Sequence, residues 1–120
     1  MDRMSKTSQL LDLSQIEEIT ATDPSLKKEL ISIFQCQIPE FISNMKSFFQ
    51  NGNLESLARE AHTAKSSVLI FGMQSTGNLL KDIQLLAEQN KTNELQQPLK
   101  QVEADLIVAS HQLDEITQNL

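Results

Sequence analysis

The sequence predicts an all-α protein, folded as an up-and-down antiparallel four-helix bundle with a short N-terminal leader helix. The chain has 120 residues, with three glycines, three prolines and neither Trp nor Tyr. Apolar residues recur every three or four positions along four long stretches, which is typical of amphipathic helices. Short connections between these stretches make consecutive helices antiparallel. A single domain over residues 1–120 is therefore expected, in which residues 1 to about 10 form a flexible N-terminus.

The leader helix is predicted to start at Ser14 and to end near Thr20. Ser14 and Glu17 have the spacing of a capping box, in which the serine caps the helix and the glutamate reaches back to it. One side of the segment is apolar and carries Leu13, Ile16 and Ile19. This pattern indicates a short amphipathic helix.

The first long helix is expected to run from Pro24 to the residues before Gly52. Asp23 is the predicted N-cap, because proline is favoured at the first helical position after such a cap. Pro39 lies inside the helix and removes one backbone hydrogen bond, so we expect a bend there rather than a break. The apolar stripe continues unshifted on both sides of that proline, through Leu30, Phe34, Ile38, Phe41, Met45 and Phe48.

The next long helix is expected to begin after Asn53, a favourable N-cap residue, and to end at Gly72. Its stripe follows steps of three and four residues, through Leu54, Leu57, Ala61, Ala64, Val68 and Phe71. A further helix follows "GMQST" and ends at "QNKTN"; it presents Leu79, Leu80, Ile83, Leu86 and Ala87. The last helix carries a heptad-like seam from Leu95 to Leu120, and Pro98 is expected to delay its regular start.

The charge and the apolar runs of the chain exclude several classes of protein. Sixteen acidic residues outnumber ten basic ones, for a formal charge of -6, and no cluster of Lys and Arg interrupts that balance. Nucleic acid and anionic membranes are therefore not expected as partners. The longest apolar run, Val68 to Met73, is too short to span a membrane, and the first residues lack the apolar core of a signal peptide. The single Cys36 excludes an internal disulfide and is expected to pack as a small hydrophobic residue, in keeping with a reducing, cytoplasmic location.

His62 is predicted to lie at the rim of its helix. At about 100° per residue, it lies about 100° from the centre of the buried stripe at Ala61. The same geometry places four residues on its side of the helix: Ala58, Lys65, Ser66 and Leu69. A helical hairpin that turns about Met73 brings position 84 level with position 62, so Gln84 is expected to face the imidazole. Gln84 can then accept from Nδ1–H and leave Nε2 as a lone pair directed at solvent.

An exposed, neutral imidazole nitrogen beside an ammonium group suits nucleophilic attack on phosphorus. The imidazole supplies the lone pair, and Lys65 can offset charge on the phosphoryl oxygens. No residues have the spacing of a catalytic triad, a glycine-rich phosphate loop or a metal-ligand pair. His111, with Asp114 and Glu115, is interpreted as part of a solvated helix face rather than as a metal site. From spacing alone, an ordinary surface histidine explains His62 equally well.

The segment "AHTAKSSVLIFG" resembles the signature of histidine-containing phosphotransfer (HPt) domains. In that family a histidine, a lysine three positions on, a small residue after the lysine and a glycine ten positions on lie along one helix of a four-helix bundle. The resemblance covers nearly the whole chain and includes the downstream "NLLKDIQLLAE" helix. It implies that His62 is the phosphoacceptor, that Lys65 is its electrostatic partner, that Gln84 orients the imidazole and that Gly72 ends the helix.

The resemblance also implies a function and its partners. HPt domains take a phosphoryl group from the phospho-aspartate of a response-regulator receiver domain and pass it to another receiver, without kinase activity of their own. Receiver domains and a hybrid histidine kinase are the implied partners. The receiver is expected to bring the aspartate and the Mg²⁺, so no cofactor is expected in this chain. Ala58, Ser66 and Leu69 would form the docking surface beside His62.

Two residues depart from the family pattern. Ser66 stands where glycine is usual, and it adds bulk and a hydrogen-bond donor at a point that a receiver loop must approach closely. Ala64 stands where leucine is usual and is expected only to thin the core. Ser66 keeps a second hypothesis open, in which the bundle binds receivers as an adaptor or inhibitor without accepting phosphate. A helical metal or cofactor carrier is a third hypothesis, disfavoured because the predicted stripes contain no inward-facing Glu or His ligands.

Overall fold

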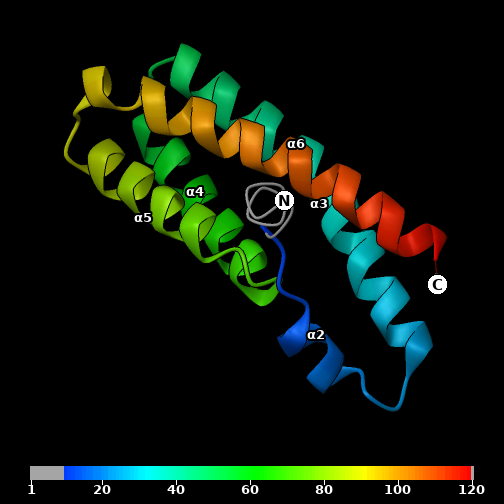
Figure 1. The fold of residues 1–120 in the computed structure, drawn as a ribbon. Coiled ribbons are helices and arrows are strands. Elements are labelled where there is room, and N and C mark those ends of the chain that lie inside the picture. The colour runs from blue at the N-terminus through cyan, green and yellow to red at the C-terminus, as the bar shows by residue number, and fades with distance from the viewer. Residues whose placement is uncertain (1–9, 120) are drawn as a thin grey trace, which may run out of the picture.

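The computed structural model describes residues 10–119, and every regular element in that range is helical (Figure 1). The leader helix is α2 (Ser14–Ile19), and the long helices are α3 (Pro24–Gln50), α4 (Leu54–Ile70), α5 (Gln74–Glu88) and α6 (Gln96–Gln118). A short 3-10 helix, η1 (Thr92–Glu94), lies between α5 and α6. The predicted all-α fold is confirmed. The predicted flexible N-terminus lies, apart from its last residue, outside the described residues.

The four long helices form the predicted up-and-down bundle. α4 packs on α3 and on α5, and α6 closes the bundle by contacting both α5 and α3. α3 and α6 have 27 and 23 residues, whereas α4 and α5 have 17 and 15. The first pair therefore extends beyond the second, and α2 lies at that end of the bundle (Figure 1). There α2 buries Ile16 completely.

Side chains and glycines at the helix ends confirm the predicted boundaries of α3 and α4. Asp23 and Asn53 each accept a hydrogen bond from the backbone N–H three residues later, at 3.1 and 3.3 Å. Gly52 and Gly72 adopt left-handed backbone conformations, with φ of 71° and 76°. These are the conformations that commonly end helices and that glycine adopts without steric cost.

The capping box predicted at Ser14 is wrong. Ser14 is the first residue of α2, and its backbone N–H and its Oγ both donate to Asp12 Oδ1, at 3.0 and 2.6 Å. Asp12 thus supplies the acceptor at this helix start, a role that Ser14 cannot take from inside the helix. The side-chain hydrogen bond from Ser14, followed by the backbone one, holds the pKa of Asp12 below its ordinary value of 3.8.

Two prolines lie inside helices without breaking them. α3 continues through Pro39, an exposed residue, so the helix is unbroken there as predicted. α6 begins at Gln96 and includes Pro98 in its first turn, so the delayed start predicted for this helix is wrong. A proline is tolerated in the first turn because the backbone N–H groups there have no partner within the helix.

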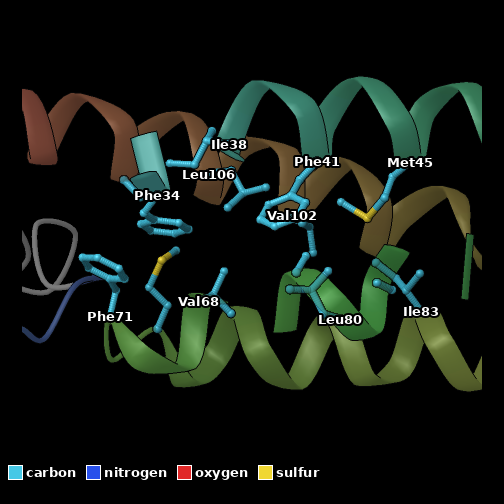
Figure 2. Packing of buried hydrophobic residues seen from close by; sticks show 14 of the residues in the cluster. Phe34, Ile38, Phe41, Met45, Val68, Phe71, Leu80, Ile83, Val102 and Leu106 are labelled. Carbon is cyan, nitrogen blue, oxygen red and sulfur yellow. The ribbon is translucent and has the colours of Figure 1, made fainter. Parts of the chain in front are cut away.

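The core lies between the α3–α6 pair and the α4–α5 pair (Figure 2). Phe34 of α3 stacks on Phe71 at the α4–α5 turn, with ring centroids 4.5 Å apart and planes inclined by 19°. Apart from the half-buried Leu54, the predicted stripe of α4 is buried, and four of its members are 0% exposed: Leu57, Ala61, Ala64 and Val68. Cys36, which was expected to pack as a hydrophobic residue, is instead exposed on α3.

The leader segment crosses the turn between α4 and α5 at Gly72. The backbone N–H of Asp12 donates to Phe71 O at 2.9 Å. A Cβ added to Gly72 would lie only 2.4 Å from both Cβ and O of Asp12. Gly72 therefore serves two purposes, because it provides the left-handed turn that ends α4 and leaves room for the leader segment.

One carboxylate is buried between α5 and α6. Asp105 is 8% exposed. Its Oδ2 accepts from Thr76 Oγ1 at 2.8 Å, and its Oδ1 accepts from Gln101 Nε2 at 2.9 Å. α5 begins at Gln74, within the stretch predicted to precede it, so Thr76 lies in its first turn. Because both carboxylate oxygens are hydrogen-bonded, Asp105 can stay buried while it ties the start of α5 to α6.

Candidate functional site

The side chain of His62 is exposed on α4. The residue before it, Ala61, is 0% exposed, so the imidazole leaves the helix at the edge of the buried stripe. This position at the rim is the one that helical periodicity predicts. The histidine is therefore accessible to a partner while its helix is anchored in the core.

Small residues let α4 and α5 approach each other closely. Gly77 on α5 faces Leu69 on α4, and a Cβ at Gly77 would lie 2.6 Å from Leu69 Cδ2. Ala61 and Ala64 on α4 and Ala87 on α5 are at most 2% exposed. The pairing of α4 with α5 is the most extensive in the bundle. Side chains at the rims of the two helices can therefore touch.

His62 and Gln84 meet across the α4–α5 groove, as the symmetry of the helical hairpin predicts. His62 Nδ1 and Gln84 Oε1 lie 3.3 Å apart. Gln84 Nε2 donates to Glu88 Oε2 at 3.1 Å. Because a carboxylate only accepts, Glu88 takes the amide nitrogen and leaves the amide oxygen for the imidazole. The hydrogen-bond network thus assigns the proton of the neutral ring to Nδ1 and the lone pair to Nε2.

Two cationic residues flank His62 along α4. Lys65, one turn later, is half-buried. Arg59, one turn earlier, is exposed, and its Nη1 lies 3.6 Å from Glu55 Oε2. Lys65 was predicted from the sequence and Arg59 was not, although both stand three residues from His62 on the same helix. Both residues stand one turn from His62, a spacing at which helical side chains can meet.

An open hollow of about 730 Å³ lies beside His62, toward the start of α4 and the end of α5. Charged and polar side chains line it, among them Arg59, Gln84 and Glu88. Ala58, predicted to contribute to a docking surface, is 5% exposed and lines the same hollow. Ala58 therefore contributes to the floor of the hollow rather than to an exposed contact.

The other predicted docking residues lie on the opposite side of His62 along α4. Ser66 is exposed one turn after the histidine, where an approaching protein would meet it. Leu69 is half-buried, and Gly77 of α5 lies against it. The surface around His62 thus consists of a hollow on one side and an exposed helix face on the other.

The described range, residues 10–119, holds neither a metal-ligand cluster nor a membrane-spanning helix. That range contains no group of three His, Cys, Asp or Glu residues that could hold a metal ion. None of its helices combines the length and the apolar character that crossing a membrane requires. His111 is an exposed residue of α6.

A match to a protein-family model shows which family the chain belongs to. A sequence model of the Hpt domain matches residues 29–120, a range that includes His62, Lys65 and Gln84. The chain belongs to the Hpt domain family. The family assignment agrees with the resemblance carried by "AHTAKSSVLIFG", which was expected to cover nearly the whole chain.

A solved structure has the same fold as this Hpt domain. The crystal structure of histidine-containing phosphotransfer protein B (HptB) from Pseudomonas aeruginosa matches with a TM-score of 0.86 and 15% sequence identity. The match covers 93% of this chain and 97% of the HptB chain. At this identity the likeness establishes the fold alone. Curated protein sequences gave no match to the chain.

Proposed function

We propose that this Hpt domain is a phosphocarrier of a multistep phosphorelay, with His62 as its phosphoacceptor. It takes a phosphoryl group from the phospho-aspartate of one receiver domain and passes it to another. The observation that carries the proposal is the exposed imidazole of His62, held through Nδ1 by Gln84 at 3.3 Å. That contact leaves the lone pair on Nε2, the ring nitrogen remote from Gln84.

The transfer step changes the bonding of one side chain of this domain. Nε2 of His62 attacks the phosphorus, and the Nε2–P bond forms as the P–O bond to the aspartate breaks. The aspartate leaves with the electron pair as a carboxylate. The proton on Nδ1 stays in place, so the ring becomes positively charged, and Gln84 Oε1 is placed to stabilise that charge. Lys65 offsets the negative charge of the phosphoryl oxygens.

The proposed partners follow from this chemistry. Receiver domains of response regulators and of hybrid histidine kinases carry the phospho-aspartate, and they bring the Mg²⁺ that their own site requires. We propose no cofactor and no kinase activity for the Hpt domain itself, and a cytoplasmic location, where such partners act. The receiver docks over His62, with the exposed turn at Ser66 on one side and the hollow at Glu88 on the other.

One observation favours a second candidate function. Ser66 is exposed one turn after His62, so its side chain occupies space at the docking surface that a glycine would leave open. A domain whose receiver binds but stops short of the imidazole would act as an adaptor or inhibitor. Serine is a small residue, and we therefore rank this function below phosphotransfer.

Incubation with a radiolabelled phospho-receiver tests the proposed function. Label on the Hpt domain that resists base and is lost in acid indicates phosphohistidine. His62→Gln is expected to abolish this label and to leave the helical circular-dichroism signal unchanged, because an exposed rim residue contributes little packing. His111→Gln, at the other histidine, is the matched control and is expected to keep the label.

The results of this assay distinguish phosphotransfer through His62 from the adaptor function and from a structural role of His62. Label that persists in His62→Gln would place the phosphoacceptor elsewhere in the chain. A receiver that binds the parent protein and transfers no label would support the adaptor function. A large loss of helicity in His62→Gln would show that His62 has a structural role.

A further inference from the structure

Glu88 ends the hydrogen-bonded row that runs from His62 through Gln84, and neither the family resemblance nor the transfer step uses it. We propose that Glu88 is a positioning residue, which holds the Gln84 amide in the orientation that keeps the lone pair of His62 on Nε2. The inference rests on the proposed function of His62 as phosphoacceptor. It adds the residue that decides which imidazole nitrogen reacts.

Gln84 by itself does not select the reactive nitrogen. A glutamine amide offers an acceptor oxygen and a donor nitrogen of nearly the same shape, and a half-turn exchanges them. With the amide oxygen toward His62, the neutral ring holds its proton on Nδ1 and its lone pair on Nε2. With the amide nitrogen toward His62, the ring accepts at Nδ1 and its proton moves to Nε2, which then has no lone pair for attack.

The carboxylate of Glu88 removes this ambiguity. It accepts hydrogen bonds and cannot donate them, and its Oε2 lies 3.1 Å from Gln84 Nε2. Gln84 and Glu88 stand four residues apart on α5, a spacing at which helical side chains meet. Turning the amide would place its oxygen against the carboxylate, so that orientation loses a hydrogen bond and brings two acceptors together.

The charges around Glu88 leave it available to Gln84. Arg59 lines the same hollow, but its guanidinium pairs with Glu55 on its own helix, at 3.6 Å. The residue before Glu88, Ala87, is 2% exposed, so the core holds the backbone of α5 next to the carboxylate. Glu88 itself is exposed. Its influence on His62 therefore comes through the direct hydrogen bond to Gln84 rather than through a long-range field, which solvent and salt screen.

The variant Glu88→Lys reverses the hydrogen-bonding preference at this position. A lysine ammonium donates and cannot accept, so it attracts the amide oxygen and turns the amide nitrogen toward His62. Transfer from a phosphorylated receiver is expected to slow by about tenfold, the lower end of what groups that orient histidines contribute in metal sites. Electrostatic attraction alone predicts faster transfer in Glu88→Lys, because an added cation near His62 attracts the phosphoryl group.

Asp82→Lys is the matched control for this change of charge. Asp82 lies on the same helix as Glu88, but it lines a separate hollow, beside Leu79 and Pro98. The control introduces the same lysine without touching the Gln84 amide. Its transfer rate is expected to stay within about twofold of the parent, because solvent and salt screen an exposed charge that makes no direct contact with the site.

A double variant tests rescue. Combining Gln84→Glu with Glu88→Gln places a carboxylate directly opposite Nδ1, and the new amide at position 88 can donate to that carboxylate. The proton of the imidazole then stays on Nδ1 although the two side chains have been exchanged. Transfer is expected to be several-fold faster than in Glu88→Lys, because Nε2 keeps its lone pair. A rate as low as that of Glu88→Lys would overturn the proposal.

Nitrogen NMR of the imidazole rings, measured on the domain without a receiver, reports the position of the ring proton independently of docking. In alkaline solution, where the ring is neutral, the nitrogen shifts of His62 are expected to place the proton on Nδ1 in the parent and on Nε2 in Glu88→Lys. His111 serves as the internal reference. If the proton of His62 stays on Nδ1 in Glu88→Lys, the proposal is overturned whatever the transfer rate. If the proton moves to Nε2 and the transfer rate equals that of the parent, the proposed effect of Glu88 on transfer is overturned. If the parent accepts no phosphoryl group, the proposed function fails, whereas the NMR measurement still decides what Glu88 does.

Discussion

Replacing Gly72 with alanine is expected to detach the leader segment from the bundle. The residue has a φ of 76°, which an alanine adopts at a steric cost of about 1 to 2 kcal/mol. The added Cβ would also lie 2.4 Å from Cβ and O of Asp12, and one of these is a backbone atom that cannot rotate away. The chain at Asp12 must therefore move off the α4–α5 turn.

The size of the effect follows from what the leader segment contributes. Moving Asp12 removes its 2.9 Å hydrogen bond to Phe71 O, which is worth about 0.5 to 1.5 kcal/mol. If α2 leaves with it, Ile16, which is 0% exposed, loses about 1.5 to 3 kcal/mol of burial. With the backbone cost included, Gly72→Ala should lower the free energy of unfolding by about 3 to 6.5 kcal/mol.

Gly52 provides a matched control for the backbone cost. Its φ is 71°, and nothing lies within 4 Å of an added Cβ. Gly52→Ala should therefore lower the free energy of unfolding by the backbone cost alone, about 1 to 2 kcal/mol. Urea unfolding followed by circular dichroism measures both variants. Equal losses in the two would refute the argument that Gly72 makes room for the leader segment.

A double-mutant cycle tests the detachment itself. Ile16→Ala should destabilise the parent protein by about 2 kcal/mol or more, because it empties a buried site. In the Gly72→Ala background the same change should have little effect, since Ile16 is then already out of the core. Additive losses would mean that α2 stays docked in the Gly72→Ala variant.

Three further predictions concern other contacts. Ser66→Gly should cost up to about 1 kcal/mol of stability while keeping or raising the transfer rate, and Ser66→Phe should leave the fold intact and strongly slow transfer. Equal rates in the parent and both variants would mean that the receiver does not dock over this turn. Thr76→Val should destabilise the protein by about 1 to 3 kcal/mol in urea unfolding, because buried Asp105 loses a donor, whereas Thr76→Ser keeps it. Folding lowers the pKa of Asp12 below 3.8, so protonation favours the unfolded chain and the stabilisation is lost as the pH falls below that value. Asp12→Asn should weaken the acid dependence of unfolding, and an unchanged dependence would contradict this account of the hydrogen bonds from Ser14.

The sequence by itself determined the features that depend on neighbours along the chain. The caps at Asp23 and Asn53 and the end of α4 at Gly72 depend on side chains and glycines within a few residues, and these were predicted correctly. The rim position of His62 follows from helical periodicity. Its pairing with Gln84 follows from the symmetry of a hairpin with a short turn, which fixes the register of the two helices.

The tertiary structure alone decided the contacts that depend on how far apart two helices lie and on which way their side chains turn. Asp12 lies against Gly72 because the leader segment folds back over the α4–α5 turn, and no local pattern in the sequence marks that crossing. The acceptor at the start of α2 is Asp12 rather than Ser14 because Ser14 lies inside the helix; this contact spans only two residues and is local. The orientation of the Gln84 amide depends on the side chain of Glu88, one turn further along α5, which lies within hydrogen-bonding distance of the amide nitrogen. A sequence fixes which residues share a helix face, whereas the hydrogen bonds between them depend on side-chain rotamers that packing selects.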